Sequence, residues 1–180
     1  MANRMSKPPL IVIIPLIIAA LAVVGIVLSR NSFNPSQAPD FTLPTTAGAN
    51  ITLSELEGLP VVLNFWSISC PWCRYQLPFL ENVALQSGGQ VKVIAVNIAD
   101  NAADVQMFFG GYEPTMTVAL DGSREVFVNY CQQYNNPKGF IPFTLLVDSE
   151  GIVQHTRTGA FASEAELRDT LEDVLGITIP

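Results

Sequence analysis

The residues with the clearest chemical potential are two cysteines, Cys70 and Cys73, with Pro71 and Trp72 between them. They follow an apolar, β-branched run (residues 61–66) and open a stretch of helical character. A thiolate at a helix N-terminus faces unpaired backbone N–H groups and the positive end of the helix dipole, which lower its pKa. Pro71 suits the first helical position, where no N–H is needed. The spacing predicts a redox pair in which Cys70 is the exposed attacking thiol and Cys73 resolves the mixed disulfide.

A structural disulfide and half of a zinc site are the alternative interpretations of the pair. A zinc site needs four ligands, and the chain offers one further cysteine (Cys131), one histidine (His155) and no second Cys-x-x-Cys. We therefore expect redox chemistry with no metal and no cofactor beyond the dithiol. Cys131 is expected to be a small buried apolar residue, with a regulatory or third redox thiol as the alternative. His155 is expected to be a surface or structural residue.

The elements that must position the cysteines alternate between strand and helix. Apolar runs rich in β-branched residues predict buried strands, and the stretches between them have helical character. This alternation predicts an α/β fold with a central sheet flanked by helices. A hairpin turn at 149–151 joins the last two strands, so the sheet should be mixed. The predicted strands are 60–66, 91–98 and 143–148, with shorter ones at 41–43, 51–53, 115–120 and 152–156, and the predicted helices are about 71–86, 101–109, 123–130 and 163–175.

The last predicted helix carries the clearest signals for its ends. Ser163 and Glu166 fit a capping box at its start, and Gly176 is placed to end it. Leu167, Leu171 and Val174 share one face, which predicts that this face packs on the sheet.

Charge divides the 180 residues unevenly. The first 30 residues carry a net charge of +3, whereas the remaining 150 hold six Lys and Arg and all 16 Asp and Glu, a net charge of −10. An acidic domain lacks the basic surface that nucleic-acid binding requires, which excludes nucleic acid as a partner. The length of 150 residues matches one domain with one hydrophobic core.

An uncharged apolar segment covers residues 10–28. As a helix, these 19 residues nearly cross a hydrocarbon core of about 30 Å. The segment is longer than the apolar region of a cleaved signal peptide, and Val27-Leu28-Ser29 makes a poor cleavage site. We therefore expect one uncleaved transmembrane helix that serves as a membrane anchor.

Basic residues set the orientation of this anchor. Arg4 and Lys7 precede it, and a single arginine follows it, so the positive-inside rule places residues 1–9 in the cytoplasm. Residues 29–38 are polar and contain proline, which predicts a short tether. The domain of residues 39–180 is then expected outside the cytoplasm, in an oxidising compartment.

Several segments together resemble one known superfamily. Residues 62–73 (VLNFWSISCPWC) resemble the active-site segment of the thioredoxin superfamily, and their best likeness is to the membrane-anchored TlpA/ResA-like thiol–disulfide oxidoreductases. Residues 38–43 and 53–58 resemble the N-terminal β-hairpin of that branch and of peroxiredoxins. Pro78 matches the kink proline of the first thioredoxin helix, and residues 141–148 resemble the cis-proline loop and the strand behind it. The resemblance implies a thioredoxin fold with an N-terminal β-hairpin.

The resemblance also assigns residues to the substrate-binding face. It implies that Pro142 is cis and lies against the cysteine pair, where the backbone of Ile141 can pair with an extended substrate segment. An ordinary trans proline at the end of a loop is the alternative. Independently, Trp72 is expected to form exposed apolar surface for a protein partner.

Two positions depart from the family pattern in a way that bears on proton transfer. Thioredoxins carry a buried Asp where this chain has Asn64, and many reductants of the TlpA branch carry a Glu where it has Gln76. Neither side chain can take or return the proton of Cys73, so we expect slower release of reduced substrate than in relatives that carry the Glu. Pro71 and Trp72, between the cysteines, also tune the reduction potential.

The resemblance implies a thiol–disulfide oxidoreductase whose default role is to reduce disulfides of exported proteins. Apocytochrome c is one candidate substrate, and a membrane thiol carrier would supply the electrons. A thiol peroxidase of the peroxiredoxin type is an alternative, since Ser67 stands three residues before Cys70, but such enzymes carry Pro where this chain has Leu63. A non-catalytic holdase or docking module is the alternative from a different class.

Overall fold

The computed structural model describes residues 35–180. The expected cytoplasmic residues 1–9, the predicted anchor at 10–28 and most of the predicted tether lie outside the described residues. Within residues 35–180, no helix combines the length and the apolar composition needed to cross a membrane.

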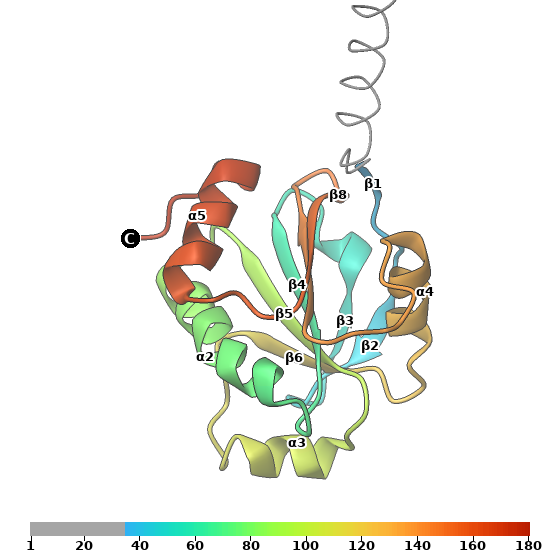
Figure 1. The fold of residues 1–180 in the computed structure, drawn as a ribbon. Helices are drawn as coiled ribbons and strands as arrows, with labels where there is room; N and C mark the ends of the chain where they lie inside the picture. Colours follow the sequence, from blue (N-terminus) through green and yellow to red (C-terminus); the bar gives the residue numbers. More distant parts are fainter. Residues whose placement is uncertain (1–34) are drawn as a thin grey trace, which may run out of the picture. The chain divides into compact units, whose positions relative to one another are not determined.

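A six-stranded mixed sheet with the order β1-β8-β7-β4-β5-β6 forms the centre of the domain (Figure 1). The central strand β4 (Val61–Trp66) runs parallel to β5 (Lys92–Asn97) and antiparallel to β7 (Phe143–Val147). Beyond them, β6 (Thr117–Leu120) pairs in parallel with β5, and β8 (Ile152–Thr158) pairs antiparallel with β7. The predicted mixed sheet, including the terminal hairpin, is confirmed.

A separate antiparallel hairpin stands at the start of the domain. Its strands are β2 (Thr42–Pro44) and β3 (Asn50–Thr52), and the short helix η1 (Leu53–Leu56) follows. The expectation of an N-terminal β-hairpin is therefore confirmed.

The outer edge of β8 is covered by a strand that the sequence did not predict. Strand β1 (Ser36–Gln37) pairs antiparallel with β8, and the Ala38 N–H donates to the Gly151 carbonyl at 2.9 Å. These residues fall in the predicted tether 29–38, which is wrong for its last residues. The physical reason is that β8 would otherwise present unpaired backbone groups at this edge, and two extended residues are enough to bond them.

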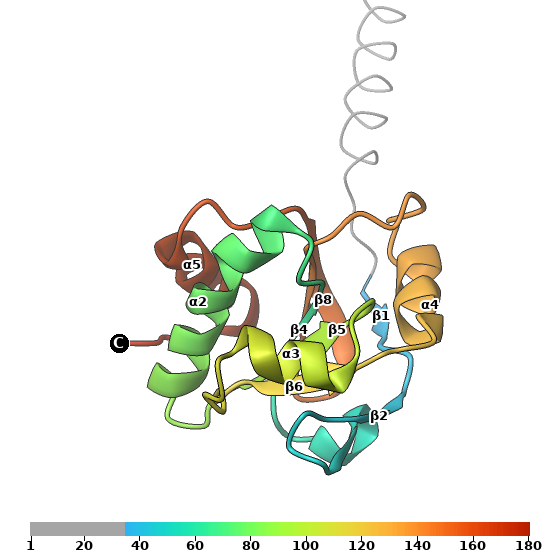
Figure 2. The ribbon, with the colours of Figure 1, turned by 90° about the horizontal axis from the view of Figure 1, so that it is seen from below.

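Within residues 35–180, α2 (Pro71–Gln86), α3 (Ala102–Phe108) and α4 (Glu125–Gln133) connect strands of the sheet, and α5 (Glu164–Leu175) follows the last strand. Helices α2 and α5 contact each other on one side of the sheet, and α4 lies on the other side (Figure 1). Figure 2, seen from below, shows α3 in front of β5 and β6, with α2 to one side and α4 to the other.

The helix ends follow local rules. Ser163 caps α5 by accepting a hydrogen bond from the Glu166 N–H at 3.2 Å, and Gly176 ends the helix in the left-handed conformation at φ 68°. Helix α4 begins later than the predicted residue 123, because Arg124 adopts a left-handed conformation at φ 64°. It also runs three residues beyond the predicted end, to Gln133, and Tyr130 and Cys131 near this end are buried in the core.

Side chains of β4 alternate between the two faces of the sheet, as the pleat of a strand requires. Leu63 and Phe65 pack in the cluster that includes α4, whereas Val62 and Trp66 pack in the cluster that includes Cys73 of α2. Trp66 is fully buried and packs in the same cluster as Cys73.

Candidate active site

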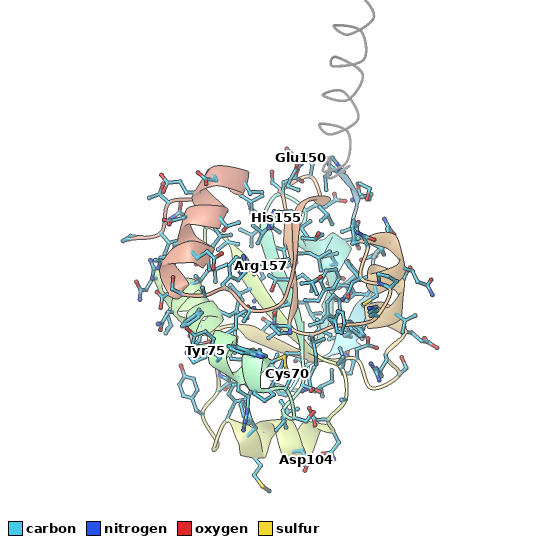
Figure 3. All side chains as sticks on the ribbon, in the orientation of Figure 1. Cys70, Tyr75, Asp104, Glu150, His155 and Arg157 are labelled. Atoms are coloured by element: carbon cyan, nitrogen blue, oxygen red, sulfur yellow. A yellow bond between two sulfur atoms is a disulfide. The ribbon has the colours of Figure 1, made fainter. Side chains whose placement is uncertain are left out.

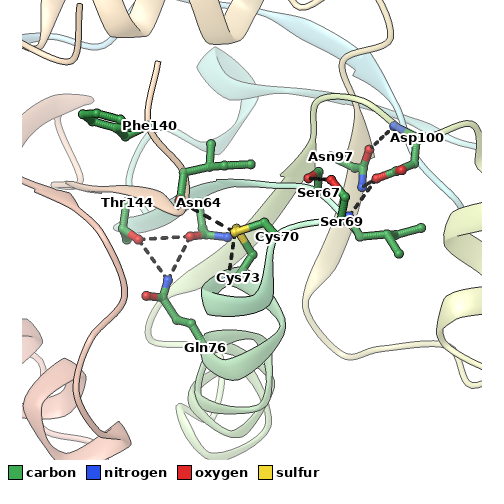
Figure 4. Close-up of a disulfide and its surroundings, with 12 residues drawn as sticks. Asn64, Ser67, Ser69, Cys70, Cys73, Gln76, Asn97, Asp100, Phe140 and Thr144 are labelled. Atoms are coloured by element: carbon green, nitrogen blue, oxygen red, sulfur yellow. Dashed lines mark hydrogen bonds between the residues drawn. A yellow bond between two sulfur atoms is a disulfide. The ribbon is translucent and has the colours of Figure 1, made fainter. Parts of the chain in front are cut away.

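Cys70 and Cys73 form a disulfide at the first turn of α2 (Figures 3 and 4). Cys70 is the N-cap of the helix, and its Sγ accepts a hydrogen bond from the Cys73 N–H at 3.1 Å. Pro71 occupies the start of the helix, as predicted. Cys70 is partly exposed, whereas Cys73 is only 1% exposed. An attacking reagent can therefore reach Cys70 more easily than its partner.

The loop before β7 brings a second segment against the pair. The Ile141–Pro142 peptide bond is cis, as the resemblance implied. The Ile141 carbonyl oxygen lies 3.7 Å from Cys70 Sγ, while Pro142 itself is buried and its carbonyl accepts the Gly159 N–H at 2.8 Å. Ile141 is only partly buried, so its backbone borders the reactive sulfur at the protein surface.

Exposed aromatic side chains surround the pair. Trp72 is 67% exposed and Phe140 is 56% exposed. Tyr75 contacts Trp72 edge to face, and its hydroxyl donates to the Ala162 carbonyl at 2.7 Å, which links α2 to the loop before α5. Trp72, Tyr75 and residues 159–162 line a groove of about 470 Å³ beside the disulfide. The predicted exposure of Trp72 is confirmed.

A polar cluster fixes the loop that leads into Cys70, and sequence analysis missed it. The Asp100 carboxylate accepts hydrogen bonds from the Ile68 N–H at 2.8 Å and from Asn97 Nδ2 at 2.9 Å (Figure 4). The Ser67 hydroxyl, part of the peroxidase-like motif, lies 3.1 Å from the Ser69 hydroxyl. The polar residues that follow β4 and β5 could have indicated this cluster from the sequence, because neighbouring parallel strands end at the same edge of a sheet.

A second polar cluster lies under the disulfide, in the core. Asn64 on β4, Gln76 on α2 and Thr144 on β7 are each no more than 1% exposed and hydrogen-bond to one another. The Gln76 carbonyl oxygen also accepts the Phe161 N–H at 2.9 Å. The sequence singled out Asn64 and Gln76 separately, and the structure brings them into direct contact, with Thr144 as a third partner.

The third cysteine and the histidine lie apart from the pair. Cys131 is buried, as predicted, and burial raises the pKa of its thiol to about 11, although a hydrogen bond from Asn136 acts in the opposite direction. Partial burial, and then the charge of Arg157, lower the pKa of His155. His155 is in the middle of β8, and Figure 3 shows it farther from Cys70 than Arg157 is. Across residues 35–180, no group of three or more His, Cys, Asp or Glu could hold a metal ion.

Comparisons with known proteins agree with this geometry. Residues 34–175 match the Redoxin family. The chain is 33% identical over 135 residues to the thiol-disulfide oxidoreductase ResA of Bacillus subtilis, covering 74% of this chain and 72% of ResA. It is also 33% identical over 125 residues to the thiol:disulfide interchange protein DsbE of Allochromatium vinosum, covering 68% and 65% of the two chains.

Among solved structures, the exposed lipoprotein thioredoxin Etrx1 of Streptococcus pneumoniae superposes with a TM-score of 0.63 at 25% identity, covering 76% of this chain and all of that one. The expected thioredoxin-like α/β fold is thereby confirmed. Together with the disulfide at the start of α2, these matches show that the chain belongs to the Redoxin family and is a thiol–disulfide oxidoreductase related to ResA and DsbE.

Proposed function

We propose that this protein reduces disulfides of exported proteins outside the cytoplasm. In the proposed cycle, the Cys70 thiolate attacks a substrate disulfide and forms a mixed disulfide. The Cys73 thiolate then attacks Cys70 Sγ, releases the substrate as a thiol and leaves the enzyme oxidised. The observation that carries these roles is the asymmetry of the pair, in which the partly exposed Cys70 caps the helix and Cys73 is buried.

The proposed cycle needs no cofactor beyond the dithiol. A stabilised Cys70 thiolate leaves and attacks readily, because unpaired N–H groups at a helix N-terminus favour negative charge. The Cys73 N–H already points at Cys70 Sγ at 3.1 Å in the oxidised form. Pro71 has no N–H of its own, so the donors that face Cys70 Sγ come from later residues such as Cys73, which is how Pro71 would tune the pair.

The surface around the pair suits an extended segment of a protein substrate. Proline at position 142 offers no N–H, so backbone pairing with a substrate would use the Ile141 backbone, beside Cys70. Trp72 and the groove that it lines with Tyr75 would then bind an apolar side chain of the same segment. The substrate class proposed is therefore an unfolded or flexible polypeptide that carries a disulfide.

The proposed location rests on the N-terminal sequence. Residues 10–28 have the length and composition of a single-pass anchor, and the charges around them favour a cytoplasmic N-terminus. An extracytoplasmic domain needs electrons from across the membrane, so a membrane thiol carrier is the proposed donor. Apocytochrome c remains a candidate substrate, since it must be a reduced dithiol before haem is attached.

Trapping of mixed disulfides tests the proposal. A Cys73→Ser variant of the full chain keeps the attacking thiol but cannot resolve its adducts, so exported proteins that contain disulfides should accumulate on Cys70. The matched control is the Cys70→Ser, Cys73→Ser double variant, which should trap nothing. A single abundant partner of the haem-attachment system would narrow the role to cytochrome c maturation. Adducts with cytoplasmic proteins alone would contradict the proposal.

A further inference from the structure

The three buried polar residues under the disulfide form a ring whose hydrogen-bond polarity is fixed from outside. The Phe161 backbone N–H can only donate, so the Gln76 oxygen must be the atom that accepts it, at 2.9 Å. The Gln76 Nε2 group therefore faces the ring, where it lies 2.9 Å from Asn64 Oδ1 and 3.1 Å from Thr144 Oγ1. An amide nitrogen carries donors only, so both of these atoms accept.

This polarity fixes the orientation of the Asn64 amide. Since the Thr144 hydroxyl accepts from Gln76, its own proton is free to go to Asn64 Oδ1, 3.0 Å away. Asn64 Oδ1 thus receives two hydrogen bonds, and Nδ2 is left outside the ring. Turning the Asn64 amide over would set its N–H groups against the Gln76 N–H, which costs free energy for buried groups.

The free end of the Asn64 amide faces the cysteine pair. Side chains alternate along β4, so that of Asn64 is on the same face of the sheet as those of Val62 and Trp66, which pack in the cluster that contains Cys73. Figure 4 shows the Asn64 side chain with its oxygen toward Gln76 and Thr144 and its nitrogen toward the disulfide.

We propose that Asn64 Nδ2 is a preset hydrogen-bond donor for the Cys73 sulfur whenever that sulfur carries a negative charge. In this proposal Asn64 is a catalytic residue, because it touches a reacting atom, and Gln76 and Thr144 are positioning residues that hold its amide in one orientation. The proposal rests on thiol–disulfide exchange itself and holds for either direction of electron flow.

The step can be followed atom by atom. An external thiolate attacks Cys70 Sγ, a new S–S bond forms there, the Cys70–Cys73 bond breaks, and its electron pair leaves on Cys73 Sγ. In the reverse step the Cys73 thiolate attacks Cys70 Sγ. Asn64 transfers no proton in either step and stabilises the charge by hydrogen bonding. A thiolate is a much stronger acceptor than a disulfide sulfur, so the bond strengthens as charge develops.

A neutral donor makes the leaving-group stabilisation independent of pH. An amide does not ionise between pH 5 and pH 9, so the rate of attack should follow only the ionisation of the attacking thiol. Asn64→Asp is the sharpest change, because its Oδ1 can accept the same two hydrogen bonds while its second oxygen replaces Nδ2. The ionised form would place negative charge toward the Cys73 sulfur.

The experiment is the reduction of the oxidised full-length protein by excess dithiothreitol from pH 5 to pH 9, with the Cys70 and Cys73 peptides quantified by differential alkylation and mass spectrometry. Rates are corrected for the fraction of dithiothreitol present as thiolate. The corrected reduction rate of the wild type should then not vary with pH. Asn64→Asp should show a new ionisation, with a rate about tenfold or more below wild type on its alkaline side. A flat profile at the wild-type rate in Asn64→Asp would overturn the proposal.

A second pair of variants keeps the proposal testable if Asn64→Asp does not fold. Thr144→Val removes the hydroxyl of the ring with little change in shape, and Thr144→Ser retains it. Thr144→Val should slow reduction severalfold at every pH, and Thr144→Ser should restore the wild-type rate. Equal rates in both variants and wild type would show that the ring does not orient the donor. If the Asn64 and Thr144 variants change the rate as expected but Cys73→Ser traps no exported protein, that result would count against the proposed cellular role alone.

Discussion

Helices α2 and α4 each carry cysteine, and they differ in almost every property that governs thiol chemistry. Cys70 begins α2 at the surface and accepts a backbone N–H, whereas Cys131 lies in the last turns of α4, 6% exposed, with a pKa raised to about 11 by burial. The difference shows that the position of a cysteine relative to a helix end and to the core decides whether it reacts or packs.

The two helices also differ in the contacts that add to their apolar packing. Helix α2 buries Leu80 and Val83 in the core. It also makes polar contacts, because Glu81 accepts hydrogen bonds from Tyr112, Thr115 and Met116, and the Tyr75 hydroxyl donates to the loop before α5. Helix α4 is fixed by aromatic packing, since Phe127 contacts the ring of Phe65 at 5.4 Å between centroids. The contacts of α2 thus include a carboxylate, that of Glu81, whose pKa, despite partial burial, is lowered by its hydrogen bonds.

The largest expected effect comes from removing the thiol of Cys70. Cys70→Ala should lower the rate of insulin disulfide reduction by about a thousandfold or more, because the nucleophile is gone. Cys131→Ala is the matched control and should stay within about twofold of the wild-type rate, as its thiol packs and takes no part in exchange. A comparable loss of reduction rate in both variants would show that Cys131 also takes part in the exchange and would contradict the assigned difference between the two helices.

Removing the buried ring of Phe127 on α4 should lower the stability of the fold without changing the reactivity of Cys70. Phe127 is 1% exposed, so Phe127→Ala should lower the free energy of unfolding by about 3–5 kcal/mol in urea titrations. The rate of Cys70 alkylation in the remaining folded protein should match wild type. A changed alkylation rate would indicate that α4 helps to shape the reactive site.

Alkylation of the reduced protein compares the two thiol environments directly. At pH 7 a thiol with a pKa of about 11 is a thiolate in roughly one molecule in ten thousand, and Cys131 is also shielded. Iodoacetamide should therefore modify Cys70 at least about 100-fold faster than Cys131, as read by mass spectrometry of each peptide. Denaturant should abolish the protection of Cys131. Similar rates for the two cysteines in the folded protein would contradict the assigned environments.

The smallest expected effect concerns Glu81 of α2. Partial burial alone would raise the pKa of its carboxyl, but hydrogen bonds from Met116, Thr115 and Tyr112 outweigh this and lower it. A carboxyl with a lowered pKa in the folded state stabilises at pH values above its usual pKa, and this stability is lost as pH falls through the lowered value.

Glu81→Gln should therefore cost about 1 kcal/mol in urea titrations at pH 7, a modest value because solvent reaches the group. The cost should shrink as the pH falls below 4.5, the usual value for Glu, where wild type loses the same carboxylate. Glu57→Gln changes an exposed carboxylate and serves as the control. A cost that does not vary with pH would show that the stabilisation by Glu81 does not depend on its charge.

Much of the fold was predictable because its signals are local. The apolar run of β4, the cysteine pair at the start of α2, and the cap residues Ser163 and Gly176 of α5 each act through neighbours in sequence. Strand β1 was not predictable, because two polar residues carry no periodicity and their partner, β8, lies more than a hundred residues away in sequence.

The roles of the two cysteines were predictable from the sequence, but the hydrogen-bonded ring of Asn64, Gln76 and Thr144 under the disulfide was not. From the sequence, Gln76 indicates only the lack of a proton acceptor and hence slow release of reduced substrate. The structure adds that the Gln76 amide donates to both Asn64 and Thr144. A Gln76→Glu change would therefore alter the ring as well as add a carboxyl. The ring joins β4 and α2 to β7, and Thr144 lies 68 residues beyond Gln76, so no local pattern could reveal it.

Strand β1 also has a mechanical consequence. The chain enters the domain through Ser36–Gln37, where the Gln37 carbonyl accepts a hydrogen bond from Tyr134 at 3.0 Å, and β8 and β7 separate this strand from β4. Traction on the N-terminal side would first shear two residues off the sheet edge. The central strand and the cysteine pair would not bear that load, so the redox centre is mechanically insulated from the point where the chain enters the fold.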